Sequence, residues 1–276
     1  MTYEEHWHRL QALYEAGEAK AIVRWVLDVR FRLSMADIIS GKVTQLSADD
    51  QTELEKIMCR LEKGEPVQYV LGMAFFRGRP FHVAPGVLIP RPETEELCEW
   101  IITDEKGIND ILDIGTGSGC IAITLSKELQ DARVSAWDIS EEALTIAKKN
   151  AKTLDTPVIF EQEDILHPKS HQNMWDVMVS NPPYIQPQES GGMEKNVLDY
   201  EPHIALFAPD GNPILFYEAI IVFATRQLKT GGRLYFELNP LTAEAVAEKA
   251  NQLGFTDTEI RRDQYGKPRF LRTKKR

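Results

Sequence analysis

The segment Asn181-Pro182-Pro183-Tyr184 contains residue types that can hold a hydrogen-bearing nitrogen. The apolar run 177–179 precedes it, and two consecutive prolines cannot donate to a sheet, so we predict a buried strand that ends at Asn181. The prolines fix two φ angles and push Asn181 toward an extended backbone, so the Asn181 amide and nearby carbonyls become acceptors in set directions. Tyr184 offers a flat face for a planar amide or base. An ordinary proline-rich turn is the alternative interpretation.

A glycine-rich segment, Gly115-Thr116-Gly117-Ser118-Gly119, separates the predicted strand 110–114 from an apolar helix that starts at Cys120. Glycines in such a turn allow tight bending and let a ligand approach the backbone. A nicotinamide-binding fingerprint would have glycine or alanine at position 120 instead of cysteine. The segment therefore predicts a nucleoside-type cofactor and disfavours an oxidoreductase.

Carboxylates follow the next two predicted strands. Asp138 ends the strand 134–137, nineteen residues after Gly119, where a carboxylate can accept both hydroxyls of a ribose. The strand 158–160 leads to Glu163-Asp164-Ile165, an acidic and apolar group that could hold an adenine. A carboxylate in a surface loop is the alternative for this last segment.

Composition limits the functional classes. The chain has 276 residues, 43% of them apolar, and a net charge of -10, although residues 261–276 are basic. An acidic body disfavours a protein that follows duplex DNA, so no direct nucleic-acid partner is expected. Three widely spaced cysteines and six histidines without a ligand pattern predict a reducing compartment and no metal site. The sequence shows neither a membrane-length apolar run nor a signal peptide, so we expect a soluble, cytoplasmic protein without a membrane partner.

The predicted elements form two regions. Residues 1–73 have helical periodicity and predict a small helical bundle, in which Ser47 with Asp50 resembles a helix-capping pair. Residues 74–90 contain short extended pieces between glycines and prolines, which predict a β-hairpin linker. In residues 91–276, strands and helices alternate after residue 108 and predict a doubly wound parallel sheet.

The glycine segment, Asp138 and Asn181-Pro182-Pro183-Tyr184, on the first, second and fourth strands, resemble the class I methyltransferases that use S-adenosylmethionine. The last motif is similar to that of enzymes that methylate a nitrogen conjugated to a π system, either a glutamine amide or an exocyclic base amine. The whole chain is similar to the PrmC/HemK family of protein-(glutamine-N5) methyltransferases. Three further segments carry this resemblance: Glu65-Pro66-Val67-Gln68-Tyr69-Val70-Leu71-Gly72, Leu88-Ile89-Pro90-Arg91-Pro92-Glu93-Thr94-Glu95 and Tyr200-Glu201-Pro202.

The resemblance implies an α/β fold: a Rossmann-like methyltransferase domain joined by a β-hairpin to a helical, substrate-recognising domain. It implies S-adenosyl-L-methionine as cofactor and the Gly-Gly-Gln motif of class I peptide chain release factors as substrate. Three alternatives remain: a ribosomal protein glutamine, an adenine N6 of nucleic acid, or a non-enzymatic nucleoside-binding adaptor.

The resemblance also implies roles for individual residues. Catalysis is expected of Asn181, Pro182 and Tyr184, and substrate binding of these three with Pro183. Arg91 or Glu93 would close over the cofactor. The residues expected to bind the cofactor are Gly115, Thr116, Gly117, Ser118, Gly119, Asp138, Ile165 and Asn181.

Overall fold

The computed structural model describes residues 1–169, 174–209 and 211–276, and the chain divides into two compact units. The first unit contains residues 1–73 and 194–200, and the second contains residues 74–193 and 201–276. The segment 194–200 is thus part of the N-terminal unit, although more than a hundred residues separate the two in sequence. Within this unit the Tyr200 hydroxyl donates to the Lys63 carbonyl at 3.0 Å.

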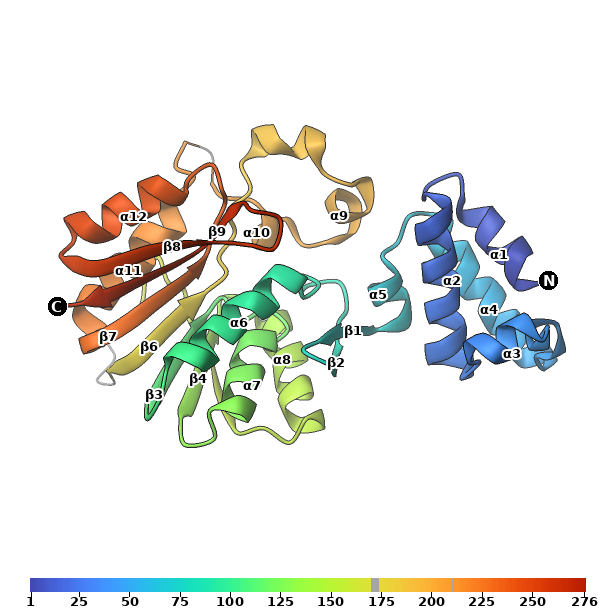
Figure 1. Ribbon diagram of the computed structural model, residues 1–276, viewed down its shortest axis with the longest axis horizontal. Coiled ribbons are helices and arrows are strands. Elements are labelled where there is room, and N and C mark those ends of the chain that lie inside the picture. The colour runs from blue at the N-terminus through green and yellow to red at the C-terminus, as the bar shows by residue number, and fades with distance from the viewer. Residues whose placement is uncertain (170–173, 210) are drawn as a thin grey trace. The chain divides into compact units, whose positions relative to one another are not determined.

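The first unit is helical, as its periodicity predicts (Figure 1). Its apolar stripes meet in one core that includes Leu10, Val26 and Met58. The predicted cap at Ser47 is present, since its side chain accepts from the Asp50 backbone N–H at 3.1 Å. The elements are α1 (Tyr3–Leu10), α2 (Ala16–Phe31), α3 (Met35–Ile39), the 3-10 helix η1 (Lys42–Gln45), α4 (Ala48–Leu61), α5 (Val67–Leu71) and α9 (Lys195–Tyr200).

The second unit is built on a seven-stranded sheet with the order β5-β4-β3-β6-β7-β9-β8, and the expected α/β fold is confirmed. Strands β5, β4, β3, β6 and β7 run parallel to one another, and β3 and β6 lie near the centre of the sheet. The strands are β3 (Asp110–Ile114), β4 (Arg133–Asp138), β5 (Val158–Gln162), β6 (Trp175–Ser180), β7 (Leu228–Glu237), β8 (Phe255–Arg262) and β9 (Pro268–Lys275). The helices are α6 (Pro92–Asp104), α7 (Cys120–Glu128), α8 (Glu141–Thr153), η2 (Pro187–Gly192), α10 (His203–Leu206), α11 (Leu215–Gln227) and α12 (Ala243–Gln252).

The prediction that strands and helices alternate to the end of the chain is wrong for the last two strands. Strands β8 and β9 are antiparallel, and β9 also pairs antiparallel with β7, so the sheet is mixed. A tight turn joins them, in which Asp263 Oδ1 accepts from the N–H groups of Tyr265 and Lys267, and Gly266 has a φ of +79°. Asp263 and Gly266 are residue types that favour a turn, so the sequence of 263–266 is typical of a β-hairpin.

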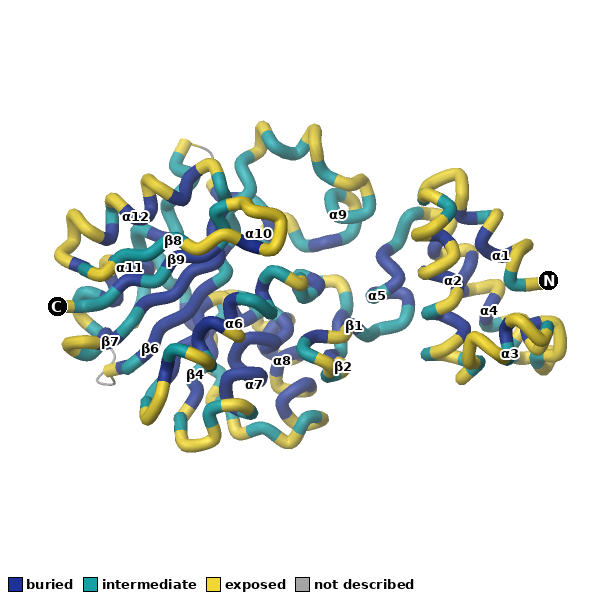
Figure 2. Tube along the Cα trace, viewed as in Figure 1, coloured by how far each residue is buried: buried dark blue, intermediate teal, exposed yellow. Residues whose placement is uncertain are grey.

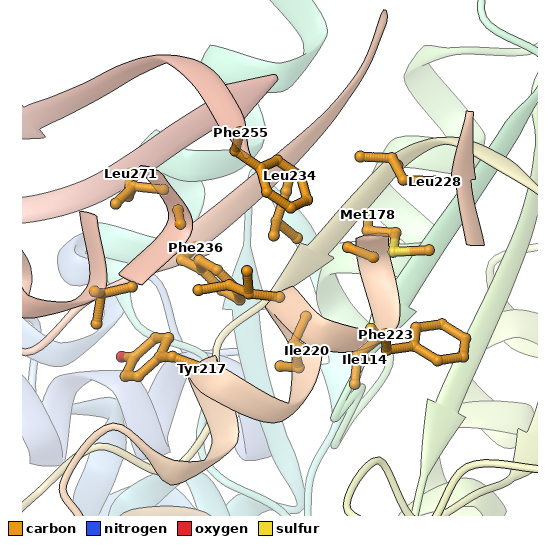
Figure 3. Packing of buried hydrophobic residues seen from close by; sticks show 14 of the residues in the cluster. Ile114, Met178, Tyr217, Ile220, Phe223, Leu228, Leu234, Phe236, Phe255 and Leu271 are labelled. Carbon is orange, nitrogen blue, oxygen red and sulfur yellow. The ribbon is translucent and has the colours of Figure 1, made fainter. Parts of the chain in front are cut away.

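Alternate side chains of the central strands enter two different cores. Met178 of β6 and Phe236 of β7 pack against α11 and α12, with Tyr217 and Ile220 beside them (Figure 3). Val179 of β6 and the neighbouring Tyr235 belong to the opposite cluster, which contains α6 and α7. Figure 2 shows β6 buried over most of its length. Helices on both faces thus hold the carboxyl ends of the parallel strands in fixed positions.

The short strands β1 (Met73–Phe76) and β2 (Arg79–His82) form the expected two-stranded hairpin. The side chain of Asn150 in α8 binds the backbone of His82 in this hairpin. Asn150 Oδ1 accepts from the His82 N–H at 2.6 Å, and Asn150 Nδ2 donates to the His82 carbonyl at 2.9 Å. In the described parts of the chain, no helix is long and apolar enough to cross a membrane, and no cluster of residues suits a metal ion.

Candidate active site

A cavity of about 350 Å³ lies at the carboxyl ends of β3, β4 and β6. Parallel α/β sheets bind ligands at this edge, and the volume is that of a small-molecule site. The structure brings most of the predicted site residues together here. Those lining the cavity are Gly115, Thr116, Gly117, Ser118, Asp138, Ile165, Asn181, Pro182 and Pro183.

The glycine loop is tied to the end of the neighbouring strand. The backbone N–H groups of Gly115 and Thr116 both donate to the Trp137 carbonyl, at 2.8 and 2.9 Å. Gly115 and Gly117 have φ angles of +76° and +54°, and a Cβ built on either would meet no heavy atom within 4 Å. The loop thus offers its backbone to open space, which suits a ligand that approaches the main chain closely.

Gly119 is not among the residues that line the cavity. A Cβ at this position would lie 3.0 Å from Ile123 Cδ1 and 3.2 Å from Ala147 Cβ, at a φ of +82°. Gly119 therefore permits the start of α7 to pack closely on α8. Its predicted contact with a cofactor remains a prediction.

Gly119 and Gly115 provide a matched pair of substitutions. We expect Gly119→Ala to lower the free energy of unfolding by about 2–4 kcal/mol, because it combines the left-handed backbone with overpacking. Gly115→Ala has a similar φ but open space around its Cβ, so it should cost about 1–2 kcal/mol. Urea denaturation measures both values, and equal losses would contradict the packing role of Gly119.

Asp138 lies at the end of β4 and directs both carboxylate oxygens to backbone donors. Oδ2 accepts from the Gly117 N–H at 2.8 Å, and Oδ1 accepts from the Ser140 N–H at 2.9 Å. Burial raises the pKa of Asp138, and these N–H groups oppose the rise. A carboxylate has roughly four acceptor sites, so acceptor capacity remains for ligand hydroxyls.

The segment after β5 adds a mixed wall formed by Glu163, Asp164 and Ile165. Glu163 is buried and pairs with Lys169 Nζ at 3.1 Å, while Asp164 accepts from the Leu166 N–H at 2.9 Å. Both carboxylates thus have partners within their own loop. Ile165 supplies an apolar surface of the kind that a nucleobase face requires.

Strand β6 ends at Ser180, one residue before the predicted end at Asn181, and Asn181, Pro182 and Pro183 all line the cavity. The Ser180 hydroxyl donates to the Ile114 carbonyl at 2.6 Å, which joins the ends of β6 and β3. The motif therefore starts from a rigid strand end.

Tyr184 has a different environment. Its ring packs against the core on the α11 side, its hydroxyl donates to Glu237 Oε1 at 3.1 Å, and it is not among the residues that line the cavity. Burial and the nearby Glu237 raise the pKa of Tyr184, so the hydroxyl keeps its proton. Stacking of Tyr184 on a substrate amide remains a prediction that this geometry does not support.

Arg91 lines the cavity and forms an ion pair with Glu201 at 2.5 Å. Glu201 is buried, and its second oxygen accepts from the Ile89 N–H at 3.0 Å. This carboxylate joins segments that lie 110 residues apart in sequence. Of the two residues expected to close over the cofactor, only Arg91 reaches the cavity, while Glu93 is not in its lining.

Sequence reasoning did not consider Asp113, which lies under the glycine loop. It is fully buried, and its Oδ2 accepts from the Thr116 hydroxyl at 2.6 Å and from the Ala122 N–H at 3.2 Å. Its Oδ1 has no partner among the described residues. Burial raises the pKa of Asp113 to about 7.

This pKa predicts a pH-dependent stability. The folded protein holds a proton on Asp113 that the unfolded chain loses above pH of about 4, so stability should fall as pH rises from about 4 through about 7. Asp113→Asn keeps an acceptor for Thr116 without the charge, and should remove roughly 2–4 kcal/mol of this decline. Urea denaturation at pH 5 and pH 8 measures the difference. An unchanged decline in Asp113→Asn would contradict the assignment.

Comparison with known proteins gives a consistent result for both units. Residues 8–72 match a model described as the PrmC N-terminal domain, and residues 95–198 match one described as the methyltransferase small domain. A release factor glutamine methyltransferase of Bacteroides thetaiotaomicron is 46% identical over 263 residues, 95% of each chain. The chain belongs to the release factor glutamine methyltransferase family.

A second member, from Flavobacterium psychrophilum, is 39% identical over 95% of this chain and 94% of its own. Among solved structures, a methyltransferase from Pyrococcus furiosus has a similar fold. That structure covers 83% of this chain and 98% of its own, with a TM-score of 0.54 and 17% identity. Family membership therefore rests on full-length relatives, and the structural likeness supports the α/β methyltransferase fold.

Proposed function

We propose that this protein transfers a methyl group from S-adenosyl-L-methionine to the side-chain nitrogen N5 of the glutamine in the Gly-Gly-Gln motif of class I peptide chain release factors. Such a modification would support translation termination in the cytoplasm. The observation that carries the proposal is Asn181 at the edge of a cavity whose other walls suit a nucleoside, in a member of this family.

The cavity residues fit S-adenosylmethionine. Asp138 has acceptor capacity left for ribose hydroxyls, and the open backbone at Gly115 and Gly117 would hold the methionine part. Ile165 would contact the adenine. When bound, the cofactor supplies an electrophilic methyl group on a sulfonium, whose sulfur departs neutral.

The residues of the Asn-Pro-Pro-Tyr motif would act on the glutamine. An amide nitrogen is a poor nucleophile because its lone pair is delocalised, so it must be aligned with the methyl group. The Asn181 side-chain oxygen and the Pro182 carbonyl would accept its two N–H hydrogens, fixing its direction and raising electron density on nitrogen. Alignment of this kind contributes up to about 7–11 kcal/mol in ideal intramolecular reactions.

We further propose a division of labour along the chain. Residues 1–73 would recognise the release factor, residues 91–276 would perform the transfer, and the hairpin 74–90 would lie between them. The helical unit has its own apolar core, which supports an independent recognition module.

The alternatives differ in the molecule that is methylated. Asn181 could also bind the exocyclic amine of an adenine in nucleic acid. That substrate requires a basic groove and an extruded base, and the net charge of -10 disfavours it. A ribosomal protein glutamine shares the nitrogen chemistry and differs only in the carrier protein.

One experiment separates these substrates. The protein is incubated with S-adenosylmethionine carrying a labelled methyl group and, in parallel, with a class I release factor, total ribosomal proteins, DNA and RNA. We expect label on the release factor alone, and loss of labelling when the Gly-Gly-Gln glutamine is replaced by Asn or Glu. Labelling of ribosomal protein or nucleic acid in preference to release factor would reject the proposal.

A further inference from the structure

A buried polar network adjoins Asn181, and one of its members, Thr94, also lines the cavity. The Asn181 Nδ2 group donates to Thr94 Oγ1 at 3.4 Å, and the Thr94 hydroxyl donates to Glu237 Oε2 at 2.7 Å. Tyr184 donates its hydroxyl to the other oxygen of Glu237, at 3.1 Å. Thr94 and Glu237 are 3% and 1% exposed, so these groups have no competing bulk water.

The fold explains how these residues meet. Ser180 and Phe236 are register partners in the parallel strands β6 and β7, so the next residues, Asn181 and Glu237, lie at the same edge of the sheet. Thr94 comes from the first turn of α6, which begins at Pro92. Three separate elements therefore converge on the back of one amide.

Hydrogen-bond counting fixes the orientation of that amide. A threonine hydroxyl has one proton, and Thr94 uses it on the Glu237 carboxylate. Toward Asn181 it can then only accept, so only the NH₂ side of the Asn181 amide can face it. The Asn181 oxygen must be on the opposite side, free to accept from a substrate nitrogen.

We propose that Thr94 and Glu237 are positioning residues that hold the Asn181 side-chain oxygen toward the substrate amide. The inference rests on the proposed function and deepens it, because it states what keeps the acceptor from rotating by half a turn. Without the network, the NH₂ group of Asn181 could face the substrate N–H groups and repel them. Tyr184 does not line the cavity, and in this proposal it acts by donating its hydroxyl to Glu237.

The network suits an ionised Glu237, because the carboxylate accepts from two hydroxyls. Thr94, Tyr184 and the positive charge of Arg269 favour this form, while burial and the charge of Glu93 oppose it and raise the pKa of Glu237. Glu237→Gln would present an NH₂ group that can donate to Thr94. The Thr94 proton would then be free to reach Asn181, and the amide could reverse.

The test measures kcat with a release factor substrate and the dissociation constant of S-adenosylmethionine by calorimetry. We expect Thr94→Val, which keeps the shape and loses the hydroxyl, to lower kcat about 10–100-fold with the cofactor affinity within twofold of wild type. Thr94→Ser should restore kcat to within about threefold. Glu237→Gln should lower kcat at least as much as Thr94→Val.

Thr124→Val is the matched control, because Thr124 is a buried threonine whose hydroxyl has no partner in the described parts of the chain. It should leave kcat unchanged. Wild-type kcat in Thr94→Val, equal losses in Thr94→Val and Thr94→Ser, or a loss that follows cofactor affinity would overturn the inference alone. If the wild-type protein methylates no release factor glutamine, the proposed function fails and this inference fails with it.

Discussion

Replacement of Asn181 by alanine is expected to reduce methyl transfer about 100–1000-fold while S-adenosylmethionine still binds. The substitution removes the side-chain acceptor that would orient the glutamine nitrogen, and a single preorganised hydrogen-bonding group at a reaction centre contributes factors of about 100–1000. Most of the predicted cofactor contacts, including Asp138 and the glycine loop, lie on other strands and remain in place.

Single-turnover kinetics and calorimetry separate these two effects in Asn181→Ala. Asn251→Ala is a suitable control, since Asn251 is an exposed asparagine of α12. Its activity should equal that of wild type. Turnover of Asn181→Ala within tenfold of wild type would show that the amide nitrogen is oriented by other groups.

Replacement of Asp138 by alanine has the second large expected effect, and here cofactor binding is lost first. Hydrogen bonds to a charged acceptor contribute about 1.5–3 kcal/mol each, so losing two ribose contacts should weaken S-adenosylmethionine binding about 100-fold or more. The glycine loop should also loosen, since Asp138 holds the Gly117 N–H. With saturating cofactor, kcat should recover much of its wild-type value.

Calorimetric titration of Asp138→Ala with S-adenosylmethionine gives the affinity directly. Asp131→Ala makes the same change of charge at an exposed position just before β4, so it controls for long-range electrostatics. If both variants bind the cofactor as wild type does, Asp138 has no role in holding the ribose.

The sequence predicted the strand ends that carry chemistry because their signals are local. Two prolines end β6, and a glycine-rich turn follows β3. Parallel pairing then brings Asp138 and Asn181 to one sheet edge without further information. The same reasoning failed at β8 and β9, where helix and strand alternation was extended over a turn that contains its own hairpin signal.

The supporting residues could not be found in this way. Thr94 and Glu201 lie in segments that carry the family resemblance, but the sequence does not show that Thr94 pairs with Glu237 or that Glu201 pairs with Arg91 and Ile89. These hydrogen bonds depend on tertiary packing. The sequence also could not show where the Tyr184 side chain points. Its proximity to Asn181 in sequence predicts a stacking surface for the substrate, but the side chain packs against the core. Only the folded structure determines which side of a strand end a residue faces.

Tandem mass spectrometry of a class I release factor, after incubation with this protein and S-adenosylmethionine, tests the central claim most directly. The account predicts one added methyl group, on the side-chain nitrogen of the Gly-Gly-Gln glutamine, with wild-type protein and none with Asn181→Ala. A methyl group on another residue, or an unmodified glutamine after incubation with the wild-type protein, would contradict it.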